Sequence, residues 1–186
     1  MKPKGIMIHS TGADNPNLKR YVGEDDGLLG INKYGNHWNT AYPGGKAICC
    51  HAFIGLDQFG TVRTYKILPW DIQGWHCGGK ANKTHIGIEI CEDKSKYYND
   101  EYINKVYKEA VEVCAYLCRT YQINPQNIIS HKEGHAKGLA SNHGDPEHWW
   151  EPNGKNMEKF RRDVAVELDR HKSYSIMIYD EKGANE

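Results

Sequence analysis

The stretch THIGIEICE, Thr84 to Glu92, alternates between two kinds of side chain. Its three isoleucines share one face of a predicted strand, because successive side chains in a strand point to opposite faces of the sheet. The residues between the isoleucines share the other face, and among them Glu89 projects from the middle of the strand. The stretch therefore predicts a strand with one apolar face and one face that carries a carboxylate.

Further strands and helices are predicted on both sides of this stretch. Four more ranges have strand patterns, Gly5–Ser10, Ile48–Leu56, Thr61–Ile67 and Gln126–Ser130, and the second and third form a hairpin. Apolar residues at steps of three and four predict helices over 101–121 and 156–171. Strands interleaved with helices indicate an α/β single domain with a mixed central β-sheet flanked by helices.

The segments between these elements are predicted to be loops, at 11–47, 69–83 and 132–154. We expect residues 1–172 to form one domain. Residues 173–186 are expected to be a tail, either an edge strand over Ser175–Tyr179 or the start of a linker.

Composition excludes several classes of function. Lys and Arg number 24, as do Asp and Glu, among 186 residues, whereas a nucleic-acid-binding protein needs a basic surplus to release counterions from phosphate. No run approaches the roughly eighteen apolar residues of a membrane span. Neither nucleic acid nor a membrane is therefore an expected partner, and no obligate protein partner is indicated. The 10 His, 12 Tyr and 5 Trp fit a metal site beside a polar substrate groove.

The amino-terminal stretch MKPKGIMIHS has an apolar run that is too short for the core of a signal peptide. We therefore expect synthesis in the cytoplasm. The six cysteines form no CxxC pair, which excludes a four-cysteine zinc ribbon and a thioredoxin-like site. We expect Cys114 and Cys118 to be small core residues of a protein in a reducing compartment.

Three candidate metal ligands follow predicted strands or lie in a later loop. His9 and His131 each close a strand, and Asp145 lies in the loop SNHGDPEHWW. The two histidines approach each other if their strands are neighbours, because ligands of α/β sheets gather at the carboxyl ends of strands. Two imidazoles and one carboxylate satisfy a catalytic zinc and leave a fourth position for water, beside which Glu89 could act as general base. The pattern HKEGH at 131–135 is neither HExxH nor HxxEH, which excludes a thermolysin-type site.

Five blocks of sequence together resemble a known family. They are IMIHSTG (6–12), HAFIGLDQFGTV (51–62), GWHCGG…N (74–82), HIGIEIC (85–91) and ISHKEG (129–134). In this order they resemble the zinc N-acetylmuramoyl-L-alanine amidases of type 2, which share their fold with the peptidoglycan recognition proteins. The stretch GLASNHGDPEHWW (138–150) is similar to the branch found in phage endolysins and autolysins of Gram-positive bacteria.

The resemblance implies a role for each candidate residue. His9 and His131 match the two zinc histidines of the family, and Asp145 matches its third ligand, so that one Zn²⁺ per chain is expected. Glu89 matches the glutamate that acts as base on the zinc-bound water.

Two of the implied assignments have alternatives. His143 stands where many members carry a Lys that stabilises the oxyanion, and Lys137 is the alternative for this role. The step from His131 to Asp145 is longer than in short-loop members, so His143 or His135 could be the third ligand instead.

The implied substrate is bacterial peptidoglycan, cleaved at the amide between N-acetylmuramic acid and L-alanine of the stem peptide. Trp75, His76 and Asn82 match the loop that would bind this substrate, although Asn82 could instead hold the loop beside the site. The protein would reach the cell wall after release or holin-dependent export, and a linker at its end would lead to a wall-binding domain. The alternatives are a non-catalytic peptidoglycan-binding module on the same fold and a zinc endopeptidase of the stem peptide.

Overall fold

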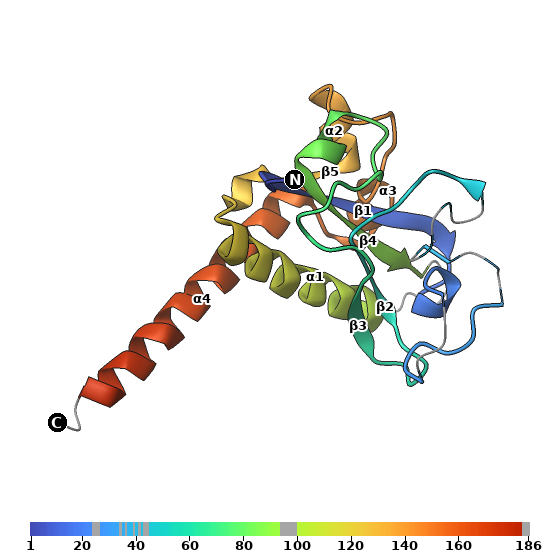
Figure 1. Cartoon of the computed structure of the whole chain (residues 1–186). Coiled ribbons are helices and arrows are strands. Elements are labelled where there is room, and N and C mark those ends of the chain that lie inside the picture. Colours follow the sequence, from blue (N-terminus) through green and yellow to red (C-terminus); the bar gives the residue numbers. More distant parts are fainter. Residues whose placement is uncertain are drawn as a thin grey trace.

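Five strands build one mixed sheet in the computed structural model, which describes residues 1–23, 27–33, 35, 37, 38, 40, 42, 45–93 and 100–183, with side chains up to residue 170. The strands are β1 (Gly5–Asp14), β2 (Ala52–Leu56), β3 (Val62–Lys66), β4 (His85–Glu92) and β5 (Ile128–Ser130). Their order is β3-β2-β4-β1-β5 (Figure 1). The β2–β3 hairpin is antiparallel and the other pairs are parallel, so the expected mixed sheet is confirmed.

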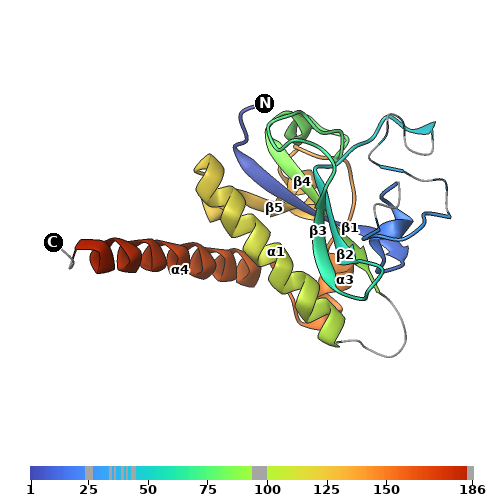
Figure 2. The same cartoon turned by 60° about the horizontal axis from the view of Figure 1, so that its bottom comes forward.

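Two long helices, α1 (Asp100–Tyr121) and α4 (Met157–Gly183), pack on one face of the sheet (Figure 2). This face carries the three isoleucines of β4, which are fully buried in the main core cluster. Ile6 and Ile8 of β1 extend the same apolar surface, and Phe160 of α4 is buried against it. The alternation in the sequence thus predicted the inner face of the sheet correctly.

The opposite face is covered by loops and short helical turns. One small apolar cluster forms around Met7 and Ile129, and another forms around Phe53, which packs with Leu18 of η1 (Leu18–Arg20). His9 and Glu89 point to this face, because they alternate with the isoleucines of β1 and β4. The remaining elements are η3 (Lys80–Lys83), η4 (Pro125–Asn127), α2 (His131–Ala136), α3 (Glu147–Trp150) and η5 (Glu151–Asn153).

Several predicted boundaries are corrected. β2 begins at Ala52 rather than Ile48, because Cys49 exchanges two backbone hydrogen bonds with Trp75 instead of joining the sheet. β1 continues past Ser10 to Asp14, where it pairs again with β4 after an irregularity. Within the predicted loop 11–47, residues 24–26, 34, 36, 39, 41, 43 and 44 lie outside the described residues.

The predicted loop 132–154 contains short helices, and the first of them is set by its amino-terminal cap. The side chain of Ser130 accepts a hydrogen bond from Glu133 N–H, and the Glu133 side chain accepts one from Ser130 N–H. This capping box satisfies two backbone donors that the first turn of a helix otherwise leaves without partners. His131 is therefore the first residue of α2 rather than the end of a strand.

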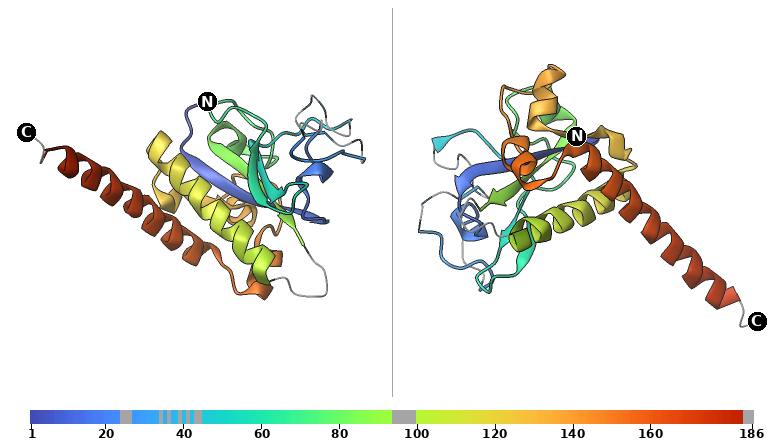
Figure 3. Two further views of the ribbon diagram at one scale, coloured as in Figure 1. Left: turned by 90° about the horizontal axis from the view of Figure 1, so that it is seen from below. Right: turned by 180° about the vertical axis from the view of Figure 1, so that it is seen from behind.

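The carboxyl-terminal prediction of an edge strand over Ser175–Tyr179 is wrong, because α4 continues through this range to Gly183. Figure 3 shows the last turns of α4 extending away from the sheet. Among the described residues, no helix combines the length and the apolar character that crossing a membrane requires.

Cys114 and Cys118 are small core residues, as predicted. Cys114 and Cys118 are buried on α1 in the main core cluster, and both carry free thiols. Burial raises the pKa of both thiols, which keeps them protonated and unreactive.

Candidate metal centre

Three side chains that are far apart in the sequence meet at the loop-covered face of the sheet. His9 comes from β1, His131 begins α2, and Asp145 lies in the loop before α3. One ligand atom from each residue lies within 4.8 Å of the others, which makes this the one such group found among the described residues. The three side chains are 1%, 6% and 13% exposed, so the group is nearly closed to solvent. The sequence prediction of this trio is supported by its geometry.

The spacing of the three side chains fits a tetrahedral zinc ion. Zinc bonds of about 2.0–2.1 Å place the ligands of a tetrahedral site roughly 3.3 Å apart. His9 Nδ1 lies 3.1 Å from Asp145 Oδ2 and 3.0 Å from His131 Nδ1. His131 Nδ1 lies 3.4 Å from Asp145 Oδ1. Two imidazole nitrogens and a carboxylate are also ligand types that zinc accepts, and three protein ligands leave the fourth position for water.

Hydrogen bonds that link α2, α3 and α4 hold His131 and Asp145 in place. Arg161 of α4 forms two bonds to the Glu133 carboxylate, at 2.8 and 3.1 Å, and so braces the cap of α2. Ser130 donates its hydroxyl to Glu147 at the start of α3. Because Ser130 precedes His131 and Glu147 follows Asp145 by two residues, one buried network fixes both ends of the loop that joins these ligands.

The charges in the group favour an ionised carboxylate at Asp145. Burial opposes the charge of Asp145. Hydrogen bonds and positive charge from the His131 and His9 rings, which a bound metal ion would replace, outweigh burial and hold the pKa of Asp145 well below its usual range. Burial lowers the pKa of His9 against the opposing attraction of Asp145. Neutral imidazoles and an ionised carboxylate are the protonation states in which these side chains bind a metal.

Glu89 lies beside this group on the same face. It is the register partner of His9 across the β1–β4 ladder. Burial, followed by repulsion from Asp145 and Glu92, raises the pKa of Glu89 to about 8. Its Oε2 atom is buried and has no hydrogen-bond partner among the described residues. A partly exposed carboxyl group with one buried, unpartnered oxygen and a pKa near neutrality is suited to exchanging a proton with a reactant.

The alternative candidates for the third metal ligand and for the oxyanion donor lie in different places. His143 is exposed, and the centre of its ring lies 4.7 Å from that of His131, at the solvent side of the group. His135 is exposed and its Nδ1 faces Ala140 O, so it does not join the other ligands. Lys137 lines a hollow with Lys4 at the amino ends of the strands, away from the metal group. The geometry therefore supports Asp145 as the third ligand, and it leaves His143 rather than Lys137 beside the site.

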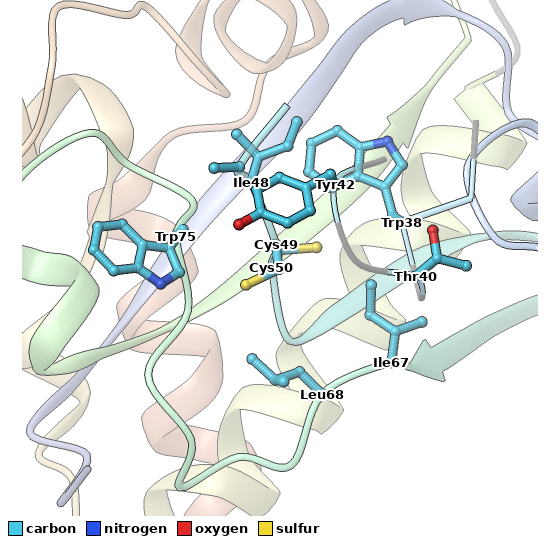
Figure 4. A pocket seen from close by; sticks show the side chains of 10 residues that line it. Trp38, Thr40, Tyr42, Ile48, Cys49, Cys50, Ile67, Leu68 and Trp75 are labelled. Atoms are coloured by element: carbon cyan, nitrogen blue, oxygen red, sulfur yellow. The ribbon is translucent and has the colours of Figure 1, made fainter. Parts of the chain in front are cut away.

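The three residues predicted to bind substrate separate into two groups. Trp75 is 56% exposed and lines a pocket of about 550 Å³ together with Trp38, Tyr42 and Ile48 (Figure 4). None of the three metal ligands lines this pocket.

His76 and Asn82, in contrast, lie behind the metal ligands. His76 Nδ1 is 2.9 Å from His9 Nε2, and Asn82 accepts a hydrogen bond from His76 N–H. Burial, followed by repulsion from His9 and His51, lowers the pKa of His76 well below its usual value, so its ring is neutral. The position of Asn82 agrees with the expectation that it holds the loop.

Sequence reasoning missed several supporting residues. The pattern Ser130-x-x-Glu133 was a local signal for the start of α2. Arg161 and Ser141 gave no such signal, because Arg161 lies 28 residues from Glu133 and Ser141 lies 64 residues from Cys77.

Comparisons with known proteins identify the family of this chain. The N-acetylmuramoyl-L-alanine amidase family matches residues 1–148, which is more than half of the chain. A probable N-acetylmuramoyl-L-alanine amidase of Bacillus licheniformis is 31% identical over 90 residues, which are 48% of this chain and 22% of that protein. The chain thus matches less than a quarter of the length of that relative.

Two solved structures show the same fold. The hydrolase AmiA of Staphylococcus aureus, solved in complex with its ligand, superposes with a TM-score of 0.64 at 15% identity, covering 90% of this chain and 73% of that one. PlyL superposes with a TM-score of 0.60 at 24% identity, covering 88% of this chain and 84% of that one. Together with the family match, the fold confirms the resemblance found in the sequence, and the chain belongs to the N-acetylmuramoyl-L-alanine amidase family.

Proposed function

We propose that this protein is a zinc-dependent peptidoglycan hydrolase that cleaves the amide between the lactyl group of N-acetylmuramic acid and L-alanine of the stem peptide. The observation that carries the proposal is the convergence of His9, His131 and Asp145 at zinc-ligand spacing, with the unpartnered Oε2 atom of Glu89 on the same face. Membership of the amidase family supports the same reaction.

His9, His131 and Asp145 would hold the ion, and zinc bound there supplies Lewis acidity that polarises a carbonyl and lowers the pKa of a water. The reaction adds water across the amide: the water oxygen bonds to the lactyl carbonyl carbon, and the carbon–nitrogen bond breaks. Glu89 accepts a proton from the attacking water and delivers it to the nitrogen of L-alanine as this amine leaves. Positive charge held by the ligands would lower the pKa of Glu89, which readies its carboxylate to accept that proton.

His143 is the candidate for stabilising the oxyanion. Its ring lies next to His131 on the exposed side of the group, where a substrate carbonyl would enter. A ring N–H aimed at that oxygen stabilises charge only as it develops, which is the condition for accelerating the chemical step.

The pocket at Trp75 is the candidate for binding the glycan or the stem peptide. The walls of this pocket are mostly apolar and include two tryptophans and a tyrosine. His76, which follows Trp75 in the sequence, contacts the metal ligand His9. Aromatic rings offer flat apolar surfaces to sugar rings and to aliphatic side chains.

Digestion of purified peptidoglycan tests the proposed reaction. Mass spectrometry of the products should show stem peptides that begin with a free L-alanine amino group, and glycan chains that keep their lactyl carboxylates. New amino termini inside the stem peptide would identify an endopeptidase instead. If the cell wall binds both the wild type and Glu89→Gln but neither protein releases products, the protein is a non-catalytic binding module.

A further inference from the structure

The ring of His76 links a metal ligand to the backbone of β4. His76 Nε2 lies 3.1 Å from the carbonyl oxygen of His85, and His76 Nδ1 lies 2.9 Å from His9 Nε2. A carbonyl oxygen can only accept, so His76 Nε2 must carry the proton of the neutral ring and His76 Nδ1 must be an acceptor. His9 therefore donates from Nε2, and this leaves its Nδ1 lone pair directed at Asp145 and His131.

A second chain of hydrogen bonds reaches the other metal histidine. His131 Nε2 lies 3.2 Å from Ser141 Oγ, and Ser141 donates its hydroxyl to the carbonyl oxygen of Cys77 at 3.0 Å. Because Ser141 has one hydroxyl proton and gives it to Cys77, its oxygen accepts from His131 Nε2–H. His131 is thereby held in the same tautomer as His9, with its Nδ1 lone pair facing the other ligands.

Both chains pass through neighbouring residues, His76 and Cys77, which one side chain holds in place. Asn82 Oδ1 accepts the backbone N–H groups of His76 and Cys77, at 2.9 and 3.0 Å. Asn82 is 5% exposed, so it does not offer this oxygen to a substrate. One buried amide thus orients both links to the metal histidines.

Gly87 of β4 leaves the space that the His76 ring occupies. A Cβ atom added at Gly87 would lie no more than 2.7 Å from three atoms of that ring. Because even alanine would collide there, the glycine is required for His76 to reach His9.

We propose that His76 and Ser141 are positioning residues, which fix both metal histidines as Nε2–H tautomers with Nδ1 free to bind the ion. This inference rests on the proposed metal site, and it reassigns His76 and Asn82 from substrate binding to support of the metal. Partners of this kind typically contribute 10- to 100-fold to metal affinity.

Zinc affinity, measured by competition with a chromophoric chelator, tests the role of His76 without any measurement of activity. His76→Phe keeps a ring but removes the acceptor for His9, and we expect its zinc affinity to fall about 10- to 100-fold. His76→Asn places an amide oxygen near the former Nδ1 position and should recover most of the affinity. The matched control is His85→Phe, which removes a neighbouring imidazole but keeps the carbonyl that His76 uses, and its affinity should equal that of the wild type.

Ser141→Ala gives an independent measurement that does not depend on folding of the His76 variants. It removes only the hydroxyl that accepts from His131, and its zinc affinity should also fall about tenfold or more. Long-range ¹H–¹⁵N spectra of the zinc-loaded protein should show Nε2–H protons on both His9 and His131.

Failure of this proposal can be distinguished from failure of the proposed function. A wild-type protein that binds no zinc would overturn both. A wild type that binds zinc through Nε2 of either histidine, or with the same affinity as His76→Phe and Ser141→Ala, would overturn the positioning role alone.

Discussion

The two faces of the sheet use the same strands for opposite purposes. On the helix-covered face, the isoleucines of β1 and β4 are fully buried against α1 and α4, and burial of apolar surface stabilises the fold. On the loop-covered face, His9 and Glu89 alternate with those isoleucines. His9 contacts Asp145 and His131, and Glu89 leaves its Oε2 atom without a partner. A strand can therefore supply stability and a reactive site at successive positions, and substitutions on the two faces should have separable effects.

The largest effect is expected from Glu89→Gln, which changes only the loop-covered face. The amide cannot accept the proton of the attacking water, so we expect the rate of peptidoglycan cleavage to fall about 10²- to 10⁴-fold. Zinc content should be unchanged, because Glu89 is outside the ligand group. The rate is measured by wall-lysis turbidity, and undiminished lysis would remove Glu89 from the mechanism.

Ile88→Ala is the corresponding change on the helix-covered face. Ile88 is adjacent to Glu89 but fully buried in the main core, so its truncation should cost about 2–5 kcal/mol of unfolding free energy. Zinc affinity of the folded variant should stay at the wild-type value. The control is Val166→Ala on α4, which is 57% exposed and should cost under about 0.5 kcal/mol. Denaturant unfolding measures the loss of stability in both variants. A loss of zinc affinity in Ile88→Ala would show that the two faces of the sheet are coupled.

The pH dependence of stability should differ between Glu89→Gln and the wild type in the metal-free protein. The pKa of Glu89 is raised from 4.5 to about 8 on folding. Between these values the unfolded chain has lost the proton and the folded chain keeps it, so wild-type stability falls as pH rises through this window. Glutamine does not titrate.

The melting temperature of Glu89→Gln relative to the wild type should therefore increase from about pH 5 to about pH 8 and then level off. Thermal unfolding at a series of pH values measures this difference. Both proteins share the titrations of His9 and Asp145, so a constant difference across the window would contradict the raised pKa of Glu89.

The smallest effect is expected from Trp75→Ala at the pocket. Losing one aromatic contact worth roughly 0.5–1.5 kcal/mol should raise KM about two- to tenfold, while kcat and zinc content stay the same. Tyr116→Ala is a suitable control, because Tyr116 is 47% exposed on α1. An equal KM for Trp75→Ala and the wild type would mean that substrate does not use this pocket.

The sequence predicted the parts of the molecule that depend on local pattern. Alternation over 84–92 revealed both faces of β4, and alternation over 5–10 placed His9 on the face opposite Ile6 and Ile8. The predicted strand end beside His9 was wrong, because β1 continues to Asp14. The role of His76 was not predicted, because its partner His9 lies 67 residues away and no local pattern marks such a contact.

The carboxyl-terminal helix shows the limit of local propensity. Ile176, Ile178 and Tyr179 favour a strand, yet residues 172–182 contain no glycine or proline to end the helix that precedes them. The helix continues to Gly183. An established helix adds one hydrogen bond per residue, which outweighs small differences in intrinsic preference.

Metal stoichiometry tests the central claim most directly. Elemental analysis should find one zinc per chain in the wild type, and none in His131→Ala. His135→Ala is the matched control, because it removes an exposed histidine of the same helix that lies outside the ligand group, and it should keep its zinc. A folded wild type without zinc, or a His131→Ala variant that keeps a full equivalent, would contradict the proposed metal centre.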